Sequence, residues 1–359
     1  MRLLIKIGVI VLLLPLKTWA FPEMVKKDYV NCISCHQSPT GGGVLTSYGR
    51  ELSRELMSHW SGEHESDFAY GLVKTPESLS LGGDFRVIQT YINNTKMIKA
   101  DYFIMQTDLE AALSVSRWTG VATLGTAKGG GFISRRHYLL YRPKDELSIR
   151  VGRFFPAYGI NTADHVIPIK RGIGFDEYLE SYNVETSWIG ESLNVYLTGI
   201  FGRLDQPTLS REKGAAVSVS YFVGEQHKLG ASYYLGEVKQ IPRHLAGPYG
   251  IFGLSHNVVL LSELDFQFSN PSTPTAQTGA VWYQRLDYEF SQGVHAYLVQ
   301  SFSKLNFHDE KSLSDSYGIG IQFFPRPHFE IQMEWQKLRV LTSAKSFTDF
   351  AWLLVHFYP

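Results

Sequence analysis

Cysteine is almost absent from this sequence. Two occur among 359 residues, so a framework of several disulfides is excluded. Long apolar runs are missing after the first twenty residues, which excludes a membrane-spanning helix from the rest of the chain. The formal net charge is +0, which argues against nucleic acid as a partner and against a polybasic membrane-binding patch. Aromatic residues, by contrast, reach 14% beside 32 glycines, a composition that favours many β-strands with aromatic girdles.

The first twenty residues are typical of a secretory signal peptide. Arg2 and Lys6 supply a positive start, residues 7–16 are apolar, and residues 18–20 end in the small residue Ala20. The alternative is an uncleaved membrane anchor, but the apolar stretch has the length of a signal peptide rather than of a membrane span. We therefore expect residues 1–20 to be removed and the mature chain to begin at Phe21.

Both cysteines belong to one short motif, Cys32-Ile33-Ser34-Cys35-His36. Two thiols at this spacing can bond the two vinyl groups of one haem, and the next residue can then reach the iron. A redox disulfide between Cys32 and Cys35 is the alternative, and the adjacent His36 favours the haem. A zinc site would need two further nitrogen or sulfur ligands at close spacing, which the sequence does not offer. The motif predicts one covalent haem c, attached to Cys32 and Cys35, with His36 as the proximal ligand of the iron.

Residues 21–66 are predicted to form one small haem segment. Pro39 and the glycines at 41–43 follow the motif, so a turn passes close to the porphyrin. A helix is expected from Thr46 to about Trp60, with Thr46 as its cap and Gly62 ending it. So short a segment cannot bury much core alone, and we expect the haem to supply part of it.

The sequence offers several residues as the second, distal ligand of the haem iron. His59 continues the apolar stripe of the predicted helix, Met57 lies about a quarter-turn away, Met24 precedes the motif, and His64 lies in the linker. A methionine ligand would raise the reduction potential relative to a second histidine. We keep His59 and Met57 as the two candidates, on helix phase alone; the alternative is that Met57 packs in the core and His59 lies on the surface.

From about residue 79 to the C-terminus, apolar and polar residues alternate. In residues 329–336, for example, apolar side chains at odd positions alternate with polar ones at even positions. Each run is about ten residues long, the length that a tilted strand needs to cross a bilayer, and about sixteen runs occur, an even number as bacterial outer-membrane barrels require. They begin near Leu79, Phe103, Trp118, Phe132, Leu147, Tyr182, Leu193, Gly214, Lys228, Gly247, Val258, Thr278, Gly293, Ser314, Phe329 and Asp349.

This pattern predicts a mainly β fold. We expect an antiparallel outer-membrane β-barrel of about sixteen strands over residues 67–359, preceded by the small N-terminal α-helical haem segment. A soluble β-sandwich or propeller also alternates, but its strands are usually shorter.

The predicted connections alternate in length as well. Tight turns fall at residues 143–146, 190–192, 224–227, 255–257, 291–293 and 325–327, and longer polar loops such as 203–213 and 306–315 lie between them. Barrels have short periplasmic turns and long extracellular loops, so the haem segment and the C-terminus are expected in the periplasm or in the lumen opening on it. The longest connection, residues 155–178, either folds into the lumen or remains a surface loop, and its length indicates a function.

The strand faces predicted to line the lumen carry an excess of acids. Arg150 and Arg285 lie among Asp108, Glu110, Glu185, Glu263, Asp265, Asp287, Glu289, Glu330 and Glu334. Polar inner faces are normal for barrels, so the charge alone proves no site. The excess would attract a divalent cation such as ferrous iron; the alternatives are plain solvation of the lumen and docking of the haem segment.

Several motifs carry a resemblance to a known family. They are Phe21-Pro22, the Cys32–His36 motif, Pro39 with its glycine run, Leu45-Thr46-x-Tyr48-Gly49-Arg50, and the barrel that follows. In this order of parts the chain resembles the fused monohaem cytochrome–porin family of outer-membrane electron-transfer proteins, best known from iron-oxidising bacteria, although motif-level similarity is confined to residues 21–60. The resemblance implies haem attachment at Cys32 and Cys35, with His36 as proximal ligand. In the known iron oxidisers the donor is extracellular ferrous iron, and no residue of this chain identifies iron.

Two functions of different classes follow from these observations. The leading hypothesis is an electron conduit in the bacterial outer membrane, in contact with its lipid, between an extracellular small reductant or oxidant and a periplasmic electron-transfer protein. Activity on ferrous iron would make it an iron oxidase. The alternative is a diffusion porin whose haem segment is a plug, a gate or a redox sensor. A haem enzyme such as a peroxidase ranks last, because no catalytic base is evident beside the motif.

Overall fold

The structure is a computed structural model of the chain. It describes residues 25, 29, 31–94, 96–126, 131–164, 166–176, 178–224, 226–269, 277–342 and 346–359. The predicted signal peptide, the predicted mature start at Phe21, and Met24 lie outside the described residues. Within these ranges, no helix has both the length and the apolar character needed to cross a membrane.

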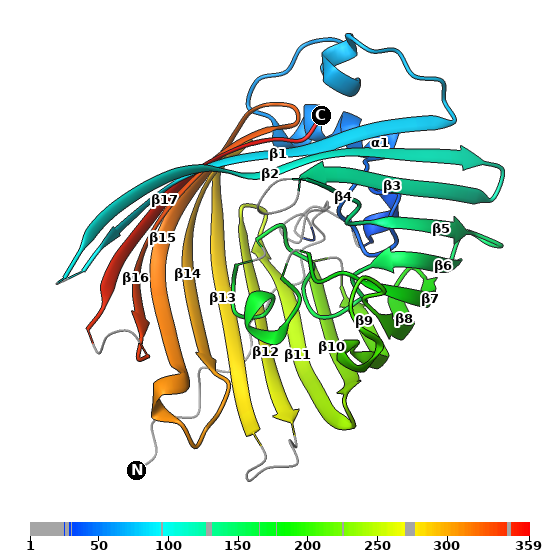
Figure 1. The fold of residues 1–359 in the computed structure, drawn as a ribbon. Coiled ribbons are helices and arrows are strands. Elements are labelled where there is room, and N and C mark those ends of the chain that lie inside the picture. The colour runs from blue at the N-terminus through cyan, green and yellow to red at the C-terminus, as the bar shows by residue number, and fades with distance from the viewer. Residues whose placement is uncertain are drawn as a thin grey trace, which may run out of the picture.

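The strands form one antiparallel sheet that closes on itself (Figure 1), because β1 pairs with both β2 and β17. The two-residue strand β4 pairs with the end of β3, and the other sixteen strands make the wall, so the predicted sixteen-stranded barrel is confirmed. The strands are β1 (Leu79–Asn93), β2 (Ile98–Val115), β3 (Trp118–Thr126), β4 (Phe132–Ile133), β5 (His137–Tyr141), β6 (Leu147–Phe154), β7 (Ser181–Ile189), β8 (Leu193–Gly202), β9 (Lys213–Val223), β10 (His227–Val238), β11 (Ile241–Ser255), β12 (Val258–Ser269), β13 (Gln277–Ser291), β14 (Val294–Lys304), β15 (Leu313–Arg326), β16 (Phe329–Val340) and β17 (Thr348–Phe357).

Alternation of side chains gives the barrel wall two different faces. On β16, Met333 and Trp335 are exposed on the outside, whereas Glu330 and Glu334 are buried on the inside. Successive side chains of a strand point to opposite faces, so the same contrast recurs from strand to strand. All of the charged residues predicted to line the lumen are buried. The outer face is the apolar surface that contact with lipid requires.

The two ends of the barrel differ in the length of their connections. At one end, which we call the short-turn end, two to five residues join neighbouring strands. The opposite, long-loop end carries the longest connection, residues 155–180 between β6 and β7, and three 3-10 turns: η5 (Arg171–Ile173), η6 (Thr208–Ser210) and η7 (Glu310–Ser312). The start of β1 and the end of β17 both lie at the short-turn end.

Residues 31–78, which we call the N-terminal segment, precede the first strand. Its elements are the 3-10 turn η2 (Cys32–Ser34), the helix α1 (Ser47–Leu52), the π-helical turn η3 (Ser53–Met57) and the 3-10 turn η4 (Phe68–Gly71). Thr46 caps α1 as predicted, since its side chain accepts a hydrogen bond from Gly49 N.

The predicted helix 46–60 is too long, because helical structure ends at Met57. The barrel ends it. The N–H groups of His59 and Trp60 donate to the carbonyls of Phe324 and Pro325, at 2.8 and 3.1 Å, and these extended bonds replace helical ones.

Three strand starts also differ from the prediction. β2 begins at Ile98 rather than near Phe103, and β11 begins at Ile241 rather than near Gly247. Residues 98–104 are exposed on both faces and therefore carry no alternation; their pairing with β1 makes them a strand. Near Phe132 only the short β4 forms, and the wall strand β5 starts at His137.

Candidate functional site

One short turn brings the two cysteines and His36 together. The N–H groups of Cys35 and His36 both donate to the carbonyl of Cys32, at 3.3 and 2.9 Å. Thr46 then ties the motif to α1: its hydroxyl donates to the Ser34 carbonyl at 2.7 Å, and its N–H donates to the Cys35 carbonyl at 2.9 Å. The motif and the first turn of α1 are therefore one structural unit.

Glycines shape the chain on both sides of this unit. A Cβ atom at Gly49 would clash with the carbonyl oxygen of Cys35, so α1 can lie directly on the motif only with glycine at this position. The glycines at 41, 42 and 43 have φ of 83°, 72° and 69°, left-handed values that glycine adopts without strain. The chain thus turns back after the motif, as predicted, and Gln37 N donates to the Val44 carbonyl at 3.0 Å.

Side chains of the barrel hold the loop that follows the motif, residues 37–43. Four barrel residues donate hydrogen bonds to this loop: Arg150 to Ser38 Oγ (3.0 Å), Tyr196 to the Pro39 carbonyl (3.1 Å), Arg142 to the Gln37 carbonyl (3.0 Å) and Asn161 to the Thr40 carbonyl (2.6 Å). Arg150 is 2% exposed and lies 2.6 Å from Glu185 on the neighbouring strand, so it donates from within the inner wall. The loop after the motif therefore lies inside the barrel at its short-turn end.

Apolar contacts seat the N-terminal segment against the same part of the wall. Ile33, inside the motif, packs against a buried cluster of Ala157, Ile189 and Tyr196. Val44 is 2% exposed and lies in a cluster with Ala112, Val121, Tyr138, Leu140 and Phe154. These partners come from β2, β3, β5, β6, β7, β8 and the connection after β6, so the motif is packed into the mouth of the barrel.

The ionisation of the motif suits a haem better than a redox disulfide. Cys32 and Cys35 are free thiols, and burial raises the pKa of both, that of Cys35 to about 11. A redox Cys-x-x-Cys pair needs a lowered thiol pKa instead. Burial lowers the pKa of His36 to about 4, opposed by a hydrogen bond to the Gly43 backbone and assisted by the charge of Arg136. His36 is therefore a neutral imidazole at pH 7.

The imidazole of His36 also keeps one nitrogen without a hydrogen-bond partner. Its Nδ1 atom is buried and has no hydrogen-bond partner in the part of the chain that the structure describes. A neutral imidazole with an unpartnered nitrogen, next to two unbridged thiols, is the donor set that a c-type haem requires. The residues present therefore fit the group that the sequence predicts.

The predicted distal ligands lie on another part of the mouth. His59 is exposed, and its Nδ1 atom lies 3.0 Å from the Gln292 carbonyl in the turn between β13 and β14. The carbonyl of Met57 lies beside Gly293 in the same turn. The motif packs instead against β7 and β8 through Ile33, and the loop after it bonds to β6 and β8; among the described residues, no hydrogen bond, ion pair or ring contact joins either candidate to His36. The assignment of His59 or Met57 as second ligand stays a prediction.

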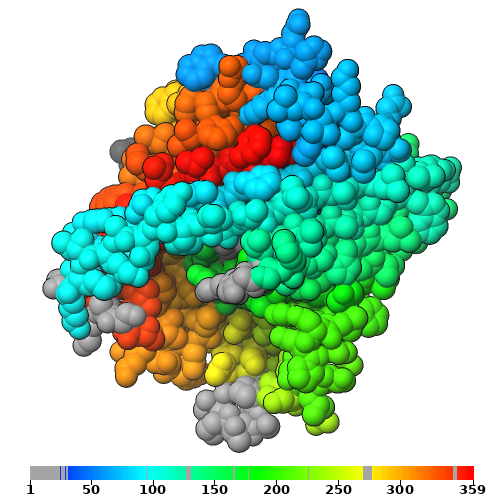
Figure 2. Space-filling model, turned by 45° about the horizontal axis from the view of Figure 1, so that its top comes forward, coloured from blue at the N-terminus to red at the C-terminus, as the bar shows by residue number. Residues whose placement is uncertain are grey.

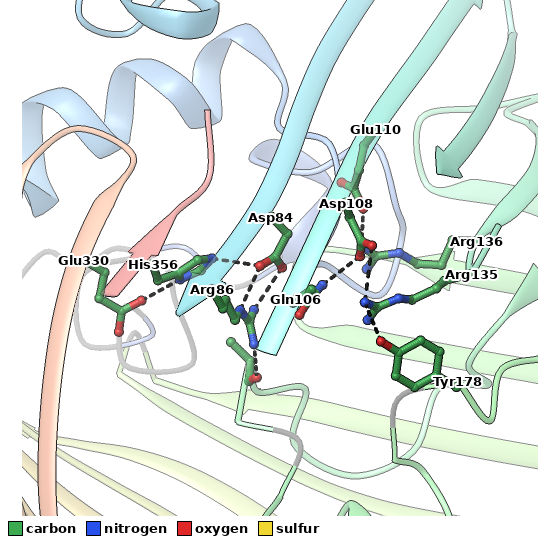
Figure 3. Close-up of polar contacts among 11 residues, drawn as sticks. Asp84, Arg86, Gln106, Asp108, Glu110, Arg135, Arg136, Tyr178, Glu330 and His356 are labelled. Atoms are coloured by element: carbon green, nitrogen blue, oxygen red, sulfur yellow. Dashed lines mark hydrogen bonds and ion pairs between the residues drawn. The ribbon is translucent and has the colours of Figure 1, made fainter. Parts of the chain in front are cut away.

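Buried charges cross-link the inner wall beside the N-terminal segment (Figure 3). His356 lies between two carboxylates, with its ring nitrogens 3.1 Å from Asp84 and 2.9 Å from Glu330. Arg86 pairs with Asp84 at 2.8 Å and also donates to the Ala163 carbonyl, at 3.0 Å. The network thus reaches from β16 across β17 and β1 to the connection that follows β6.

Two arginines ahead of β5 pair with the predicted lumenal acids of β2. Arg135 lies 3.2 Å from Asp108 and 3.2 Å from the Tyr178 hydroxyl, and Arg136 pairs with Glu110 (Figure 3). These carboxylates are thus engaged by cations of the chain itself. Among the described residues, no group of three or more His, Cys, Asp or Glu side chains could hold a metal ion.

The longest connection, residues 155–180, folds into the lumen (Figure 1), the first of the two predicted alternatives. Tyr158 donates to Asp265 at 2.9 Å, and Ile160 N donates to Glu263 at 2.6 Å. Further along, Ile169 is fully buried in a cluster with inner-wall residues of β8 to β11, β13 and β14. The lumen is therefore occupied by the N-terminal segment at the short-turn end and by this connection beyond it.

Three residues that hold the motif loop were not predicted: Arg142, Tyr196 and Asn161. Tyr196 faces inward by the alternation of β8, and that pattern could have identified it. Arg142 directly precedes a predicted tight turn, which places it at the mouth. Asn161 lies in the long connection, where no local pattern indicates its position.

The barrel is similar to solved structures of bacterial outer-membrane proteins. A loop L8 deletion mutant of OmpT of Vibrio cholerae is 10% identical over 78% of this chain and 99% of its own, with a TM-score of 0.62. The outer membrane channel DcaP of Acinetobacter baumannii is 11% identical over 80% and 99%, with a TM-score of 0.59. OprB of Pseudomonas putida is 9% identical over 79% and 94%, with a TM-score of 0.61. No family model and no curated protein matches the sequence. The chain thus has the fold of outer-membrane porins and related barrels.

Proposed function

We propose that this protein is an electron conduit of the bacterial outer membrane, in which a porin-type barrel holds one covalent c-type haem in its short-turn mouth. The observation that carries the proposal is the position of Cys32, Cys35 and His36. They directly precede the loop of residues 37–43, which Arg150 and Tyr196 hold inside the barrel, and Ile33 between the two cysteines packs against the inner wall. By the length of its connections, the short-turn end would face the periplasm.

The residues of the motif have separate roles in this proposal. The thiols of Cys32 and Cys35 would form the two thioether bonds, and the neutral imidazole of His36 would ligate the iron. When bound, the haem supplies a one-electron redox centre whose potential depends on burial and axial ligands. Arg150 and Tyr196 hold the loop after the motif, and the wall excludes lipid from the site.

The partners in this proposal lie on opposite sides of the membrane. An extracellular small reductant or oxidant would exchange electrons at the long-loop end, and a periplasmic electron-transfer protein would do so at the short-turn end. Membership of the fused cytochrome–porin family belongs to the same proposal, and it is supported by the motif together with the barrel. Ferrous iron is one candidate donor, and oxidation of it would make the protein an iron oxidase.

The test compares intact cells that express the wild type, the Cys32→Ser/Cys35→Ser variant, or no protein. With the cellular machinery for c-type haem attachment present, we expect covalent haem on the wild-type barrel alone. A membrane-impermeant reductant should reduce that haem in intact cells. Electrons should then pass to periplasmic cytochromes, and unchanged reduction of those cytochromes in cells without the protein would refute the conduit. A wild-type barrel without covalent haem would refute the haem assignment itself.

A second candidate is a diffusion porin in which the N-terminal segment is a plug, a gate or a redox sensor. The likeness to solved porins and to an outer membrane channel favours this candidate more directly than it favours electron transfer. Conductance in planar bilayers distinguishes the two functions. A steady conductance that is independent of the redox state of the haem would support the porin. An occluded barrel that still passes electrons would support the conduit.

A further inference from the structure

The N-terminal segment does not end at the mouth; it continues onto the rim of the barrel. The ring of Trp60 lies 5.8 Å from that of Phe323 on β15, at an interplanar angle of 82°. The ring of Tyr70 lies 5.9 Å from that of Phe357 on β17, and the Tyr70 hydroxyl donates to the Pro327 carbonyl at 2.8 Å. In Figure 2 the blue residues of this segment lie beside the orange and red residues of the last strands.

The phenylalanines in these contacts belong to the outside of the barrel. Gln322 bonds to Arg285 of the inner wall, and His356 bonds to Glu330 of the inner wall. Because side chains alternate along a strand, the next residues, Phe323 and Phe357, point outward. Phe357 also stacks on Phe85 of β1, with the ring centroids 6.3 Å apart. Trp60 and Tyr70 therefore extend the outer, lipid-facing surface of the wall.

Apolar side chains between Trp60 and Val73 are exposed. Trp60 is 56% exposed, Leu72 is 86% exposed, and Val73 follows Leu72 directly. The backbone brings Tyr70 onto Phe357 through left-handed φ values at Ala69 and Tyr70, 50° and 57°, which non-glycine residues rarely adopt. A strained turn thus presents aromatic and aliphatic side chains beside the outer wall.

We propose that residues 59–73 are a peripheral membrane anchor, which places Trp60, Tyr70 and Leu72 in the phospholipid interface at the short-turn end. The occupant follows from continuity, because Trp60 and Tyr70 directly touch the wall that faces lipid. Aromatic side chains favour the headgroup level of a bilayer, where their rings contact acyl chains and their polar atoms stay hydrated. The acids Glu63 and Asp67 are exposed, and an interfacial position, unlike deep insertion, leaves them in water.

Tyr48 shows that exposure alone does not define this anchor. It is 52% exposed, nearly the same as Trp60, but its hydroxyl bonds to Tyr29, and it lies in the first turn of α1, directly before Gly49, which packs on the backbone of Cys35. Tyr48 therefore lies over the motif and not on the outer wall. It is a matched control for Trp60 within the same segment.

The experiment is lipid photocrosslinking of the full-length protein in nanodiscs of phosphatidylethanolamine and phosphatidylglycerol. The photoreactive residue p-benzoylphenylalanine replaces Trp60, Leu72, Tyr48 or Met333, one at a time, and mass spectrometry measures the lipid adduct. Met333, on the outer face of β16, reports lipid contact of the wall. We expect yields at 60 and 72 within about twofold of that at 333, and at least about fivefold above that at 48.

The inference rests on the outer-membrane location in the proposed function, and the controls separate the two. No lipid adduct at 333 would overturn the membrane location itself. An adduct at 333 with yields at 60 and 72 no higher than at 48 would overturn only the anchor, as would a protein adduct in place of lipid at 60. Fluorescence of the wild type minus that of Trp60→Phe, in vesicles with brominated acyl chains, is an independent measurement. Quenching of Trp60 is expected, and an unquenched Trp60 would also overturn the anchor.

Discussion

Arg150 joins the barrel wall to the loop that follows the cysteine motif: its Nη1 atom donates to Ser38 at 3.0 Å, while its Nη2 atom lies 2.6 Å from the Glu185 carboxylate. Both members of the ion pair are almost completely buried. The pair is therefore a fixed part of the inner wall, and Ser38 is bound to it. The position of the motif in the barrel mouth therefore depends on the wall as well as on the N-terminal segment.

The double variant Arg150→Gln/Glu185→Gln should loosen the N-terminal segment without leaving a lone buried charge. Loss of a charge-assisted hydrogen bond to Ser38 is worth about 1.5–3 kcal/mol. We expect faster hydrogen exchange in residues 31–46, measured by mass spectrometry, while the strands stay protected. The matched control is Arg339→Gln/Asp315→Asn, which removes a pair 2.8 Å apart on β16 and β15. If both variants leave exchange in residues 31–46 unchanged, Arg150 does not hold the loop.

Tyr158→Phe should release the inward connection from the wall. The variant removes the donor to Asp265, a carboxylate that is 1% exposed, and leaves the bond from Ile160 N to Glu263 in place. An unsatisfied buried acceptor costs about 1–3 kcal/mol, so the thermal midpoint should fall and exchange in residues 166–176 should rise. Tyr221→Phe, on the exposed outer face of β9, is the control and should change neither. Equal behaviour of the two variants would contradict the proposed contact.

The strands could be predicted because the alternation of apolar and polar residues in the sequence reflects the two faces of the barrel wall, one exposed and one buried. β6 and β8 begin at Leu147 and Leu193, where the alternation placed them, since burial of one face is what alternation encodes. The two-residue turn between β10 and β11, and with it the start of β11 at Ile241, escaped prediction for the opposite reason. Lys239 and Gln240 take φ of 53° and 64° without the glycine or asparagine that usually marks such a turn.

Part of the candidate site could likewise be predicted from the sequence, and part could not. Cys32, Cys35 and His36 form a local motif, so their association could be predicted from spacing alone. The bond between Arg150 and Ser38 joins residues 112 positions apart, and neither stretch encodes it. It depends on the closure of the barrel and on the path of the N-terminal segment into it. The helix ending before His59 has the same origin, because a partner on β15 displaced local helical bonds.

Two buried histidines predict that acid loosens the N-terminal segment when haem is absent. Burial lowers the pKa of both His36 and His328 to about 4, against about 6.5 in an unfolded chain. The folded state thus disfavours the added proton, so the stability is fully present above about pH 6.5 and is lost as pH falls toward 4. His328 is 1% exposed, and its backbone N–H donates to Ser53 Oγ at 3.2 Å, so its protonation acts directly on this segment.

The measurement is hydrogen exchange of residues 31–66 between pH 7 and pH 4 in the haem-free Cys32→Ser/Cys35→Ser variant, corrected for intrinsic exchange rates. We expect protection to fall with acid. Adding His36→Asn should remove part of the dependence in residues 31–46, and adding His328→Asn should remove part of it in residues 53–66. His256→Asn, in the turn between β11 and β12, is the control and should leave the profile unchanged. A flat profile in the parent variant would contradict the prediction.

Gly49→Ala tests the packing of α1 on the motif, because two physical effects predict opposite outcomes. Helix propensity alone would stabilise α1 by up to about 1 kcal/mol. The added Cβ atom, however, would clash with the backbone oxygen of Cys35, and relief of such overpacking costs about 1–3 kcal/mol. We expect the clash to dominate, so that α1 moves off the motif and exchanges faster, even in the haem-free protein.

In cells that attach haem, covalent haem per folded barrel should fall in the Gly49→Ala variant although both thiols and His36 are intact. The matched control is Gly62→Ala, where the nearest atom to the new Cβ, in the Glu65 side chain, is 3.5 Å away. The Gly62→Ala variant should keep both exchange and haem content. If Gly49→Ala behaves like Gly62→Ala, the close contact between α1 and Cys35 does not exist in the folded protein.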